Sequence, residues 1–330
     1  MRAAFALALA LVPAVATADA RHDIVDLRHG RTVSEHEFLG WSPGADAVVR
    51  RRVCSEDGEL SCTVTIDELG VGKPPRTSIL YRNLGELYER ADADNPKGPI
   101  STAEATGFIR REATVLAGLP PLTPGTAATP PRSVFGAIDG VPTKLAIAMN
   151  PTSDDMIFRL SLGVHGPGGA FVKLADLPGE ASDVTTRQWQ AHVSPDGSDI
   201  AIIVEYESSF MCWTGESIEA VAASRGSVRA QLHNAVGLDA YREGELDRAR
   251  DAFVAATAED PAYAWGWFNR AALESRSGDP DAAHASLKKA IDLDITKGDR
   301  ACRDSDFDAL AATAAGAALM ACTSEAETEH

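Results

Sequence analysis

Two adjacent stretches in the last third of the chain share one length and one pattern. Residues 230–263 read AQLHNAVGLDAYREGELDRARDAFVAATAEDPAY, and residues 264–297 read AWGWFNRAALESRSGDPDAAHASLKKAIDLDITK. When these 34-residue stretches are aligned, small or apolar residues recur at matching positions. The matched pairs are Gly237 and Ala271, Gly244 and Gly278, Ala249 and Ala283, Phe253 and Leu287, and Ala256 and Ala290. A repeat of this length indicates units that stack, because one unit alone cannot bury its apolar face.

Each stretch is predicted to form a pair of helices. From residue 230 onward the chain is rich in alanine and lacks the β-branched runs that precede it. Gly237 and Ala249 are small enough for two helices to cross closely at their positions. Gly244 and Gly278 are suited to end the first helix of each pair. Pro261 lies where the first pair stops and the second begins.

This pattern resembles the tetratricopeptide repeat. That family has a large apolar residue at position 4, Gly or Ala at 8, Ala at 20, Phe at 24, Ala at 27 and Pro at 32. The two units fit at positions 8, 20, 24 and 27, whereas His233 departs at position 4 of the first and Ile295 at position 32 of the second. Arg270 also stands where the family usually has Leu. The resemblance covers about 68 of the 330 residues.

The resemblance implies a concave face made by the first helix of each unit. Trp267, at position 4, would fill the seam between two helices. The residues implied to line the concave face and contact a protein or peptide partner are Asn234, Leu238, Tyr241, Trp265 and Phe268. Large aromatic rings on an open face suit anchoring of a partner's apolar side chain, and Asn234 could bond its backbone. The alternative is that the β domain or a C-terminal capping helix covers these rings.

A bound C-terminal carboxylate is disfavoured by the same comparison. Leu238 and Phe268 occupy groove positions where the family's carboxylate clamp needs polar groups. Residues 298–330 are predicted to form a capping helix, centred on SDFDALAATAAGAALMAC at 305–322, and a polar tail. Since two repeats fall short of the usual three, this helix or the β domain must complete the core.

Residues 21–225 are predicted to form a mostly β domain, sandwich-like or propeller-like, so the predicted fold class is α+β. Helices are predicted within it at 79–93 and at 105–119, the second preceded by a capping box of Ser101 and Glu104. The proline-rich stretch 119–132 is predicted to be a loop. Runs rich in Val, Ile and Thr, separated by turn residues, predict strands at 46–53, 60–66, 143–150, 156–163, 170–175 and 198–206.

Two segments of this domain resemble each other. FLGWSPGADAVVRRRV at 38–53 and QAHVSPDGSDIAIIVE at 190–205 both pass through Ser-Pro and a turn into a strand. The second is similar to a signature of TolB-type and WD-like β-propeller blades. A propeller repeats its blades at about 40–50 residues, whereas the two serines are 152 residues apart. The alternative is a Ser-Pro turn between two strands of another β fold.

Two short segments match hydrolase sequence motifs, but the residues around them do not fit the chemistry of those motifs. GWSPG at 40–44 reads like a nucleophile elbow, and HGPGG at 165–169 is close to an esterase oxyanion loop. The residue after Ser42 is Pro43, which lacks the N–H that an oxyanion hole needs. A strand-like run follows where an elbow needs a helix, and HGPGG comes after the serine instead of before it. We therefore expect Ser42 to lie in a turn that enters a strand, and HGPGG to form a turn between strands.

Composition and the N-terminus limit the compartment and the partners. Residues 1–20 have the charged start, apolar run and A-x-A sites of a signal peptide, with cleavage expected after Ala18 or Ala20. This predicts a periplasmic or secreted protein with no membrane insertion after cleavage. The net charge of −17 argues against nucleic acid as a partner. Histidines and cysteines show no metal-ligand spacing, so neither a metal site nor another cofactor is predicted.

The chain has five cysteines, at 54, 62, 212, 302 and 322. A hairpin loop centred on Gly58 would place Cys54 opposite Cys62 and predicts a disulfide between them. A two-residue turn would instead pair Cys54 with Ser61. A continuous helix between residues 302 and 322 would hold those two cysteines about 30 Å apart. Cys212 is expected to be a buried thiol.

Three functions remain open from the sequence. The first is a non-enzymatic binding or scaffold protein that presents its repeats to a partner. The second is a structural role in which the repeats only pack on the β domain. The third is a hydrolase-type enzyme with a site in the β domain, which needs a triad assembled in space.

Overall fold

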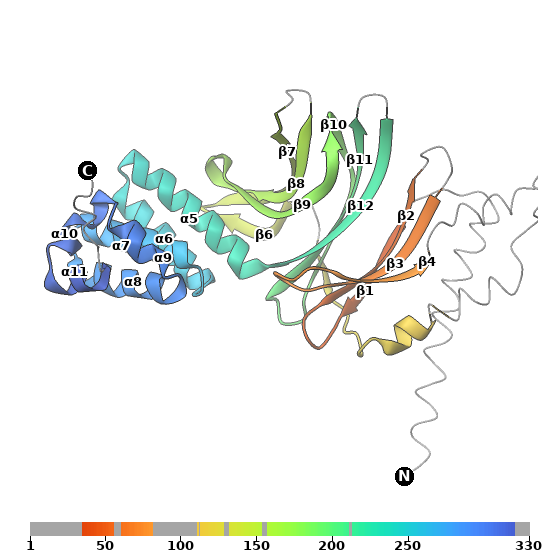
Figure 1. Cartoon of the computed structure of the whole chain (residues 1–330), viewed down its shortest axis with the longest axis horizontal. Coiled ribbons are helices and arrows are strands. Elements are labelled where there is room, and N and C mark those ends of the chain that lie inside the picture. Colours follow the sequence, from red (N-terminus) through yellow and green to blue (C-terminus); the bar gives the residue numbers. More distant parts are fainter. Residues whose placement is uncertain are drawn as a thin grey trace, which may run out of the picture. The chain divides into compact units, whose positions relative to one another are not determined.

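The computed structural model describes residues 35–55, 61–81, 111, 113–128, 132–153, 157–210 and 213–320. Apart from a short helix at 113–118 and a 3-10 turn between two strands, the strands come first along the chain and the helices follow (Figure 1). The predicted α+β class, a β region followed by antiparallel helix pairs, is confirmed. The signal peptide, the Ser101–Glu104 capping box, Cys212 and Cys322 lie outside the described residues.

The strands form three four-stranded antiparallel sheets. The first, in the order β1-β2-β3-β4, consists of Glu35–Trp41, Ala47–Ser55, Ser61–Leu69 and Arg76–Tyr81. The second, in the order β12-β11-β10-β5, consists of Trp213–Ser224, Asp199–Phe210, Asp183–Val193 and Thr126–Ala128. The third, in the order β6-β7-β8-β9, consists of Arg132–Ile138, Val141–Pro151, Phe158–His165 and Phe171–Ala181.

All six predicted strand runs coincide with observed strands, but two other predictions need correction. The helix predicted at 79–93 does not form at its first three residues, because residues 79–81 are the end of β4. These residues are Ile, Leu and Tyr, which pack well on a pleated sheet. The rest of that stretch lies outside the described residues. The predicted loop 119–132 contains β5, which pairs with β10 over three proline-free residues. Residues 113–118 are helical, as predicted within 105–119.

A buried apolar cluster joins the first two sheets. It contains Trp41, Val49 and Leu69 from the first sheet and Ala201, Ile203 and Ile218 from the second, each at most 3% exposed. The side chains of Ile200–Val204 are all buried, so β11 is covered on both faces. That burial explains why its sequence is a continuous apolar run instead of an alternating one.

Both Ser-Pro segments form turns between neighbouring strands, as predicted. Ser42 follows β1, and its Oγ accepts a bond of 3.1 Å from the N–H of Asp46. Ser194 follows β10, and its Oγ accepts one of 2.9 Å from the N–H of Asp199. The serine hydroxyl therefore closes a tight turn at both places. HGPGG likewise includes a single turn of 3-10 helix, Pro167–Gly169, between β8 and β9.

The repeat region forms two helix pairs joined by short turns. These helices are α5 (Arg225–Glu243), α6 (Leu246–Glu259), α7 (Ala264–Arg276) and α8 (Pro280–Leu293). Gly244 and Gly278 have φ of 81° just after α5 and α7, as expected for glycines that end helices. A Cβ on Gly237 would lie 2.5 Å from the ring of Phe253, so α5 and α6 cross where only glycine fits.

The predicted continuous capping helix is wrong. Residues 296–320 form four short pieces, namely α9 (Thr296–Ala301), η2 (Ser305–Phe307), α10 (Asp308–Ala311) and α11 (Ala314–Met320). Asp304 caps η2 by accepting from the N–H of Asp306, and Thr313 Oγ1 accepts from the N–H of Gly316. These polar residues stop one helix and start the next. The chain thus folds back, and Cys302 Sγ lies 3.6 Å from the carbonyl oxygen of Met320.

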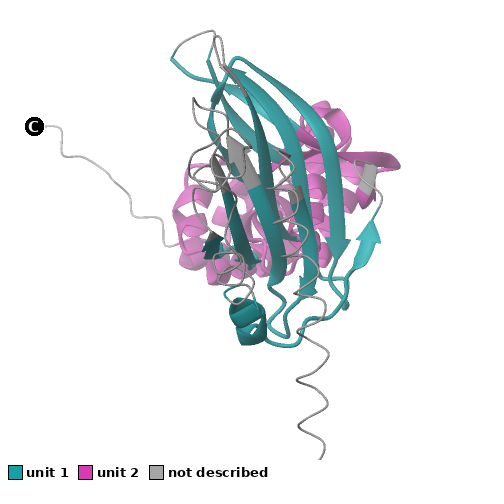
Figure 2. Ribbon diagram, turned by 90° about the vertical axis from the view of Figure 1, so that its right-hand side faces the viewer, with its two compact units in different colours: residues 1–130, 147–162, 174–223 teal, residues 131–146, 163–173, 224–330 magenta. Residues whose placement is uncertain are grey.

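Two compact units divide the chain (Figure 2). The first comprises residues 1–130, 147–162 and 174–223, and the second comprises 131–146, 163–173 and 224–330. The second unit therefore holds the helices together with two segments from the third sheet, a division that the sequence did not suggest. Inside it, Arg229 donates to the carbonyl of Phe135 at 2.6 Å and to Glu259 at 2.8 Å.

Candidate functional site

Trp265 lies on the floor of a basin in the helical unit. Its indole, in the first turn of α7, faces α9 and the loop that follows α9. The basin has a volume of about 600 Å³. Its lining is mostly polar and consists of Trp265, Thr296, Lys297, Asp299, Arg300, Arg303, Asp304 and Ser305.

Two cationic side chains of α9 lie over the indole of Trp265. Lys297 Nζ is 3.9 Å from the ring centroid, and Arg300 Cζ is 4.7 Å from it. Cations are attracted to the electron-rich face of an indole more strongly than to other aromatic rings. The aromatic ring therefore holds both side chains against the helix surface.

The lysine of this pair is already neutralised. The side chain of Lys297 is only 4% exposed, and its Nζ lies 2.5 Å from Asp294 Oδ2. Bonds from Lys297 and then from Thr296 lower the pKa of Asp294 to about 2. Lys297 therefore acts as a structural cation beneath the basin, with its charge satisfied by Asp294.

The two arginines of the basin have no such partner. Among the residues that the structure describes, neither Arg300 nor Arg303 forms an ion pair with a carboxylate. Asp304, which also lines the basin, already accepts from the backbone of η2. A guanidinium held over an indole keeps its N–H edge for a planar carboxylate, which it can bind through two parallel bonds. The basin therefore combines two guanidinium groups that have no described carboxylate partner with the carboxylates of Asp299 and Asp304.

Phe268 is not available on an open face. The side chain is 2% exposed and packs 5.1 Å from the ring of Phe307 and 5.6 Å from that of Trp265. Leu310, also buried, donates its N–H to Ser275 Oγ of α7. The alternative expectation, that the C-terminal segment covers this part of the face, therefore holds for Phe268. In this structure Phe268 belongs to the core cluster of the helical unit.

The other predicted contact residues are engaged with their neighbours. Asn234 is 7% exposed, and its Oδ1 accepts from Asn269 Nδ2 at 2.7 Å. Leu238 is half-buried against the core between α5 and α6. Tyr241 accepts from Arg276 at 2.8 Å, and burial followed by its bond to Asp306 raises its pKa to about 12. Of the five, only Trp265 lines the basin.

Trp267 combines the packing role predicted for it with polar contacts. It packs half-buried against the cluster that contains Phe268 and Phe307. Its Nε1 donates to the carbonyl of Pro261 at 3.0 Å, and Arg270 Cζ lies 5.4 Å from its ring centroid. Arg270, which departs from the family pattern, is thus placed over an indole and paired with Glu274 at 2.7 Å.

Sequence reasoning missed the cationic side of the basin. Lys297, Arg300 and Arg303 recur every third residue in an otherwise acidic chain. Such spacing places basic side chains on one face of a helix, and this signal could have identified them. Lys297 ends the second predicted repeat, Arg300 and Arg303 lie in the predicted capping region, and none of the three was predicted to be a contact residue.

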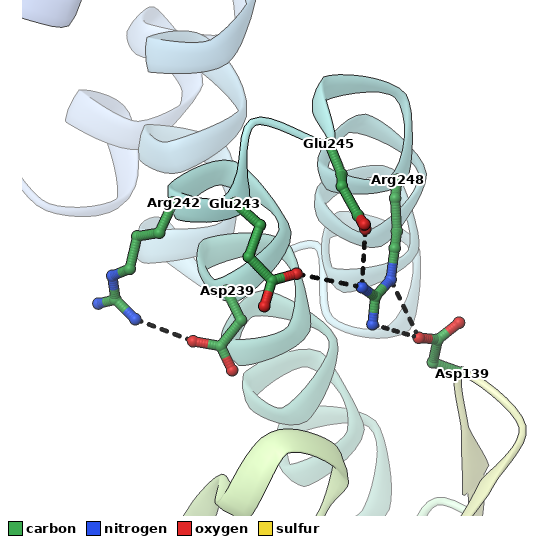
Figure 3. A network of polar contacts seen from close by, with 6 residues as sticks. All are labelled: Asp139, Asp239, Arg242, Glu243, Glu245 and Arg248. Atoms are coloured by element: carbon green, nitrogen blue, oxygen red, sulfur yellow. Dashed lines mark hydrogen bonds and ion pairs between the residues drawn. The ribbon is translucent and has the colours of Figure 1, made fainter.

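A second polar network in the same unit differs in having its arginines paired (Figure 3). Arg248 of α6 binds Asp139 at 2.9 Å, as well as Glu245 and Glu243. Arg242 binds Asp239 at 2.9 Å. Asp139 lies with Gly140 in the turn between β6 and β7, with φ of 50° and 74°, as a two-residue hairpin requires. The network fastens this hairpin to α6 and leaves no cation without a carboxylate.

The comparisons give no further guide to the site. No protein-family model, curated protein or solved structure matches the chain. Within the described parts, no group of three or more metal-ligating side chains occurs. No helix there is both long and apolar enough to cross a bilayer.

Proposed function

We propose that this protein is a non-enzymatic binding protein, and that its helical unit holds a carboxylate-bearing segment of a partner protein. The observation that carries the proposal is the pair Arg300 and Arg303, which lack a described carboxylate partner beside the indole of Trp265. Tryptophan and arginine are the residues most enriched at the energetic centres of protein interfaces. The resemblance of the helix pairs to tetratricopeptide repeats, a family that binds peptides, agrees with this function.

The basin favours a peptide over an extended acidic polymer. A chain of net charge −17 repels polyanions at long range. Recognition must therefore come from contacts at close range, a carboxylate on the guanidinium groups and an apolar group beside the indole. Ser305, which also lines the basin, supplies a hydroxyl for the peptide backbone, whereas the hydroxyl of Thr296 donates to Asp294 at 2.7 Å.

The test uses two labelled peptides that differ only in charge, Ac-EEFEE-amide and Ac-QQFQQ-amide. Fluorescence anisotropy with the mature protein should show tighter binding of the glutamate peptide, and the difference should shrink with added salt. The double variant R300Q/R303Q should weaken that binding by about tenfold or more. A variant that removes two exposed arginines elsewhere, R242Q/R250Q, controls for the change in net charge.

Equal binding of both peptides, or equal loss in the two double variants, would contradict the proposal. Thermal unfolding of each variant separates loss of contact from loss of fold. Because Arg300 and Arg303 are exposed, we expect their replacement to leave the unfolding temperature nearly unchanged. The same variants can then be used to select among proteins that the mature chain captures from a periplasmic extract.

A further inference from the structure

The first compact unit contains an apolar pocket that the proposed function does not use. It has a volume of about 310 Å³ and is bounded by the end of β3 and by β8, β9 and β12. Its apolar walls include Leu69, Leu162, Leu174, Leu177 and Val221. This volume lies at the low end of the range for small-molecule sites.

Small side chains create the space. Ala175, Ala220 and Ala222 line the pocket between the larger residues. Protein interiors are otherwise close-packed, and few voids exceed the size of a water molecule. A volume of this size, next to leucines that are almost wholly buried, is therefore a place where a ligand of matching shape gains apolar contact.

One carboxylate, Glu219, stands among these apolar walls. It shares the single guanidinium of Arg51 with Asp67, which is fully buried. Arg51 lies 2.5 Å from Asp67 and 3.2 Å from Glu219, so Asp67 has the closer contact. One cation therefore serves two carboxylates, and the group is left with one negative charge.

The surroundings of Glu219 make this charge costly without a further cation. Burial is the main cause that raises the pKa of Glu219, and Arg51 only partly offsets it. Asp67 additionally accepts from the hydroxyls of Thr65 and Thr77, which leaves Glu219 the less well-satisfied carboxylate. Lys73 at the pocket rim is 68% exposed and directed to Asp46 at 3.7 Å. Asp176, which also lines the pocket, accepts a bond of 3.2 Å from Ser161 Oγ.

We propose that this pocket binds a small organic cation, an apolar group that carries one protonated amine. The ammonium would lie at Glu219 and complete the charge balance with Arg51 and Asp67. The apolar group would lie against Leu162, Leu174 and Leu177. An organic anion of the same size would meet an uncompensated carboxylate and is excluded by the same charge balance.

The test is calorimetric titration of the mature protein with hexylamine, hexan-1-ol and hexanoate at neutral pH. Hexylammonium should bind more tightly than hexanol, and hexanoate should not bind measurably. The variant Glu219→Gln should weaken the binding of hexylammonium by about tenfold or more and leave the affinity for hexanol unchanged. Equal affinity for the amine and the alcohol, or no detectable binding of the amine, would overturn the proposal.

A second variant keeps the test decisive if Glu219→Gln disturbs Arg51. Ala222→Phe adds a ring to the wall of the pocket at a residue outside the charged group, and it should abolish binding of the amine and of the alcohol alike. Ala127→Phe, at an exposed position of β5, is the matched control and should bind as the unmodified protein does. Amine binding that survives Ala222→Phe would place the ligand elsewhere and refute the assignment.

Discussion

The guanidinium carbon of Arg300 lies 4.7 Å above the indole centroid of Trp265, and Lys297 Nζ lies 3.9 Å from the same ring. The two cations have different surroundings. Lys297 is nearly buried and paired with Asp294, whereas Arg300 is exposed. Lys297 is therefore held within the helical unit, whereas Arg300 is one of the two cations that the proposed partner would contact.

The structural role of Lys297 predicts a loss of stability when it is removed. Lys297→Ala leaves Asp294 without its closest partner and removes one of the two cations over Trp265. We expect the free energy of unfolding to fall by about 1–3 kcal/mol. Urea titration measures it, and Lys288→Ala, which breaks an exposed i,i+4 pair with Asp292, should cost less than about 0.5 kcal/mol. Equal losses of unfolding free energy in Lys297→Ala and Lys288→Ala would show that the burial of Lys297 contributes nothing to stability.

The crossing of α5 and α6 predicts coupling between Gly237 and Phe253. Gly237→Ala places a methyl 2.5 Å from the Phe253 ring, and overpacking of this kind costs about 1–3 kcal/mol. In a Phe253→Leu background the same change should be neutral or stabilising, because alanine favours a helix over glycine by about 1 kcal/mol. The second unit already combines Ala271 with Leu287 at these positions. A double-mutant cycle with no coupling would show that the two helices relax apart freely.

A histidine pair in the first compact unit predicts sensitivity to acid. Burial is the main cause that lowers the pKa of both His36 and His192 below 6.5, and His192 is stacked on Phe38 at 4.0 Å. Below pH 6.5 the unfolded chain binds more protons at these sites than the folded chain. Their contribution to stability is therefore complete above pH 6.5 and declines as the pH falls below it. Urea unfolding from pH 7.5 to 5 should show this decline.

The double variant His36→Gln/His192→Gln should have a shallower decline over the same range. Burial is also the main cause that lowers the pKa of His233 in the second unit. His233 should therefore make its own contribution to the decline of stability with falling pH, and this contribution should remain in the double variant. An unchanged slope in the double variant would mean that other groups cause the acid sensitivity.

The fold of the C-terminal segment changes the expected disulfide pattern. Cys302 Sγ lies 3.6 Å from the carbonyl oxygen of Met320, and Cys322 follows Met320 by two residues in the sequence. We therefore expect a bridge between Cys302 and Cys322, which a continuous helix would have kept apart. In the first sheet, the register pairs Cys54 directly with Cys62, as the predicted hairpin bridge requires.

Peptide mapping without reductant should accordingly find two linked pairs, 54–62 and 302–322, and leave Cys212 as the thiol that alkylates after unfolding. Recovery of Cys302 as a freely alkylated peptide would contradict the second pair. A bridge from Cys212 to any other cysteine would contradict the scheme as a whole.

The repeat helices were predictable because their determinants are local. Gly244 and Gly278 end helices by their own conformation, and the Gly237–Phe253 contact follows from the repeat spacing. The strands with continuous apolar or β-branched runs were predictable for the same reason. Strands such as β10, which reads DVTTRQWQAHV, were missed because polar residues alternate on an exposed face.

The site was less predictable because it depends on how distant segments pack. Trp265 was predicted as a contact residue from its position in the repeat, but its neighbours come from α9, which spans the end of the second predicted repeat and the start of the predicted capping region. The sequence left open whether Phe268 is covered, because nothing local shows that Phe307 folds back to pack against it. The Asp139-Gly140 turn, by contrast, is a strong hairpin signal that the sequence carried and the prediction did not use.

The most direct test of the account is a ¹H–¹⁵N NMR titration of the mature protein with the glutamate peptide, following the indole N–H of Trp265. Trp265→Phe assigns this resonance among the five tryptophans. If the peptide binds in the basin, the Trp265 signal and the guanidinium signals of Arg300 shift together and saturate with the binding curve. The proposed site is contradicted if the peptide binds while Trp265 stays unperturbed and another surface of the protein shifts instead.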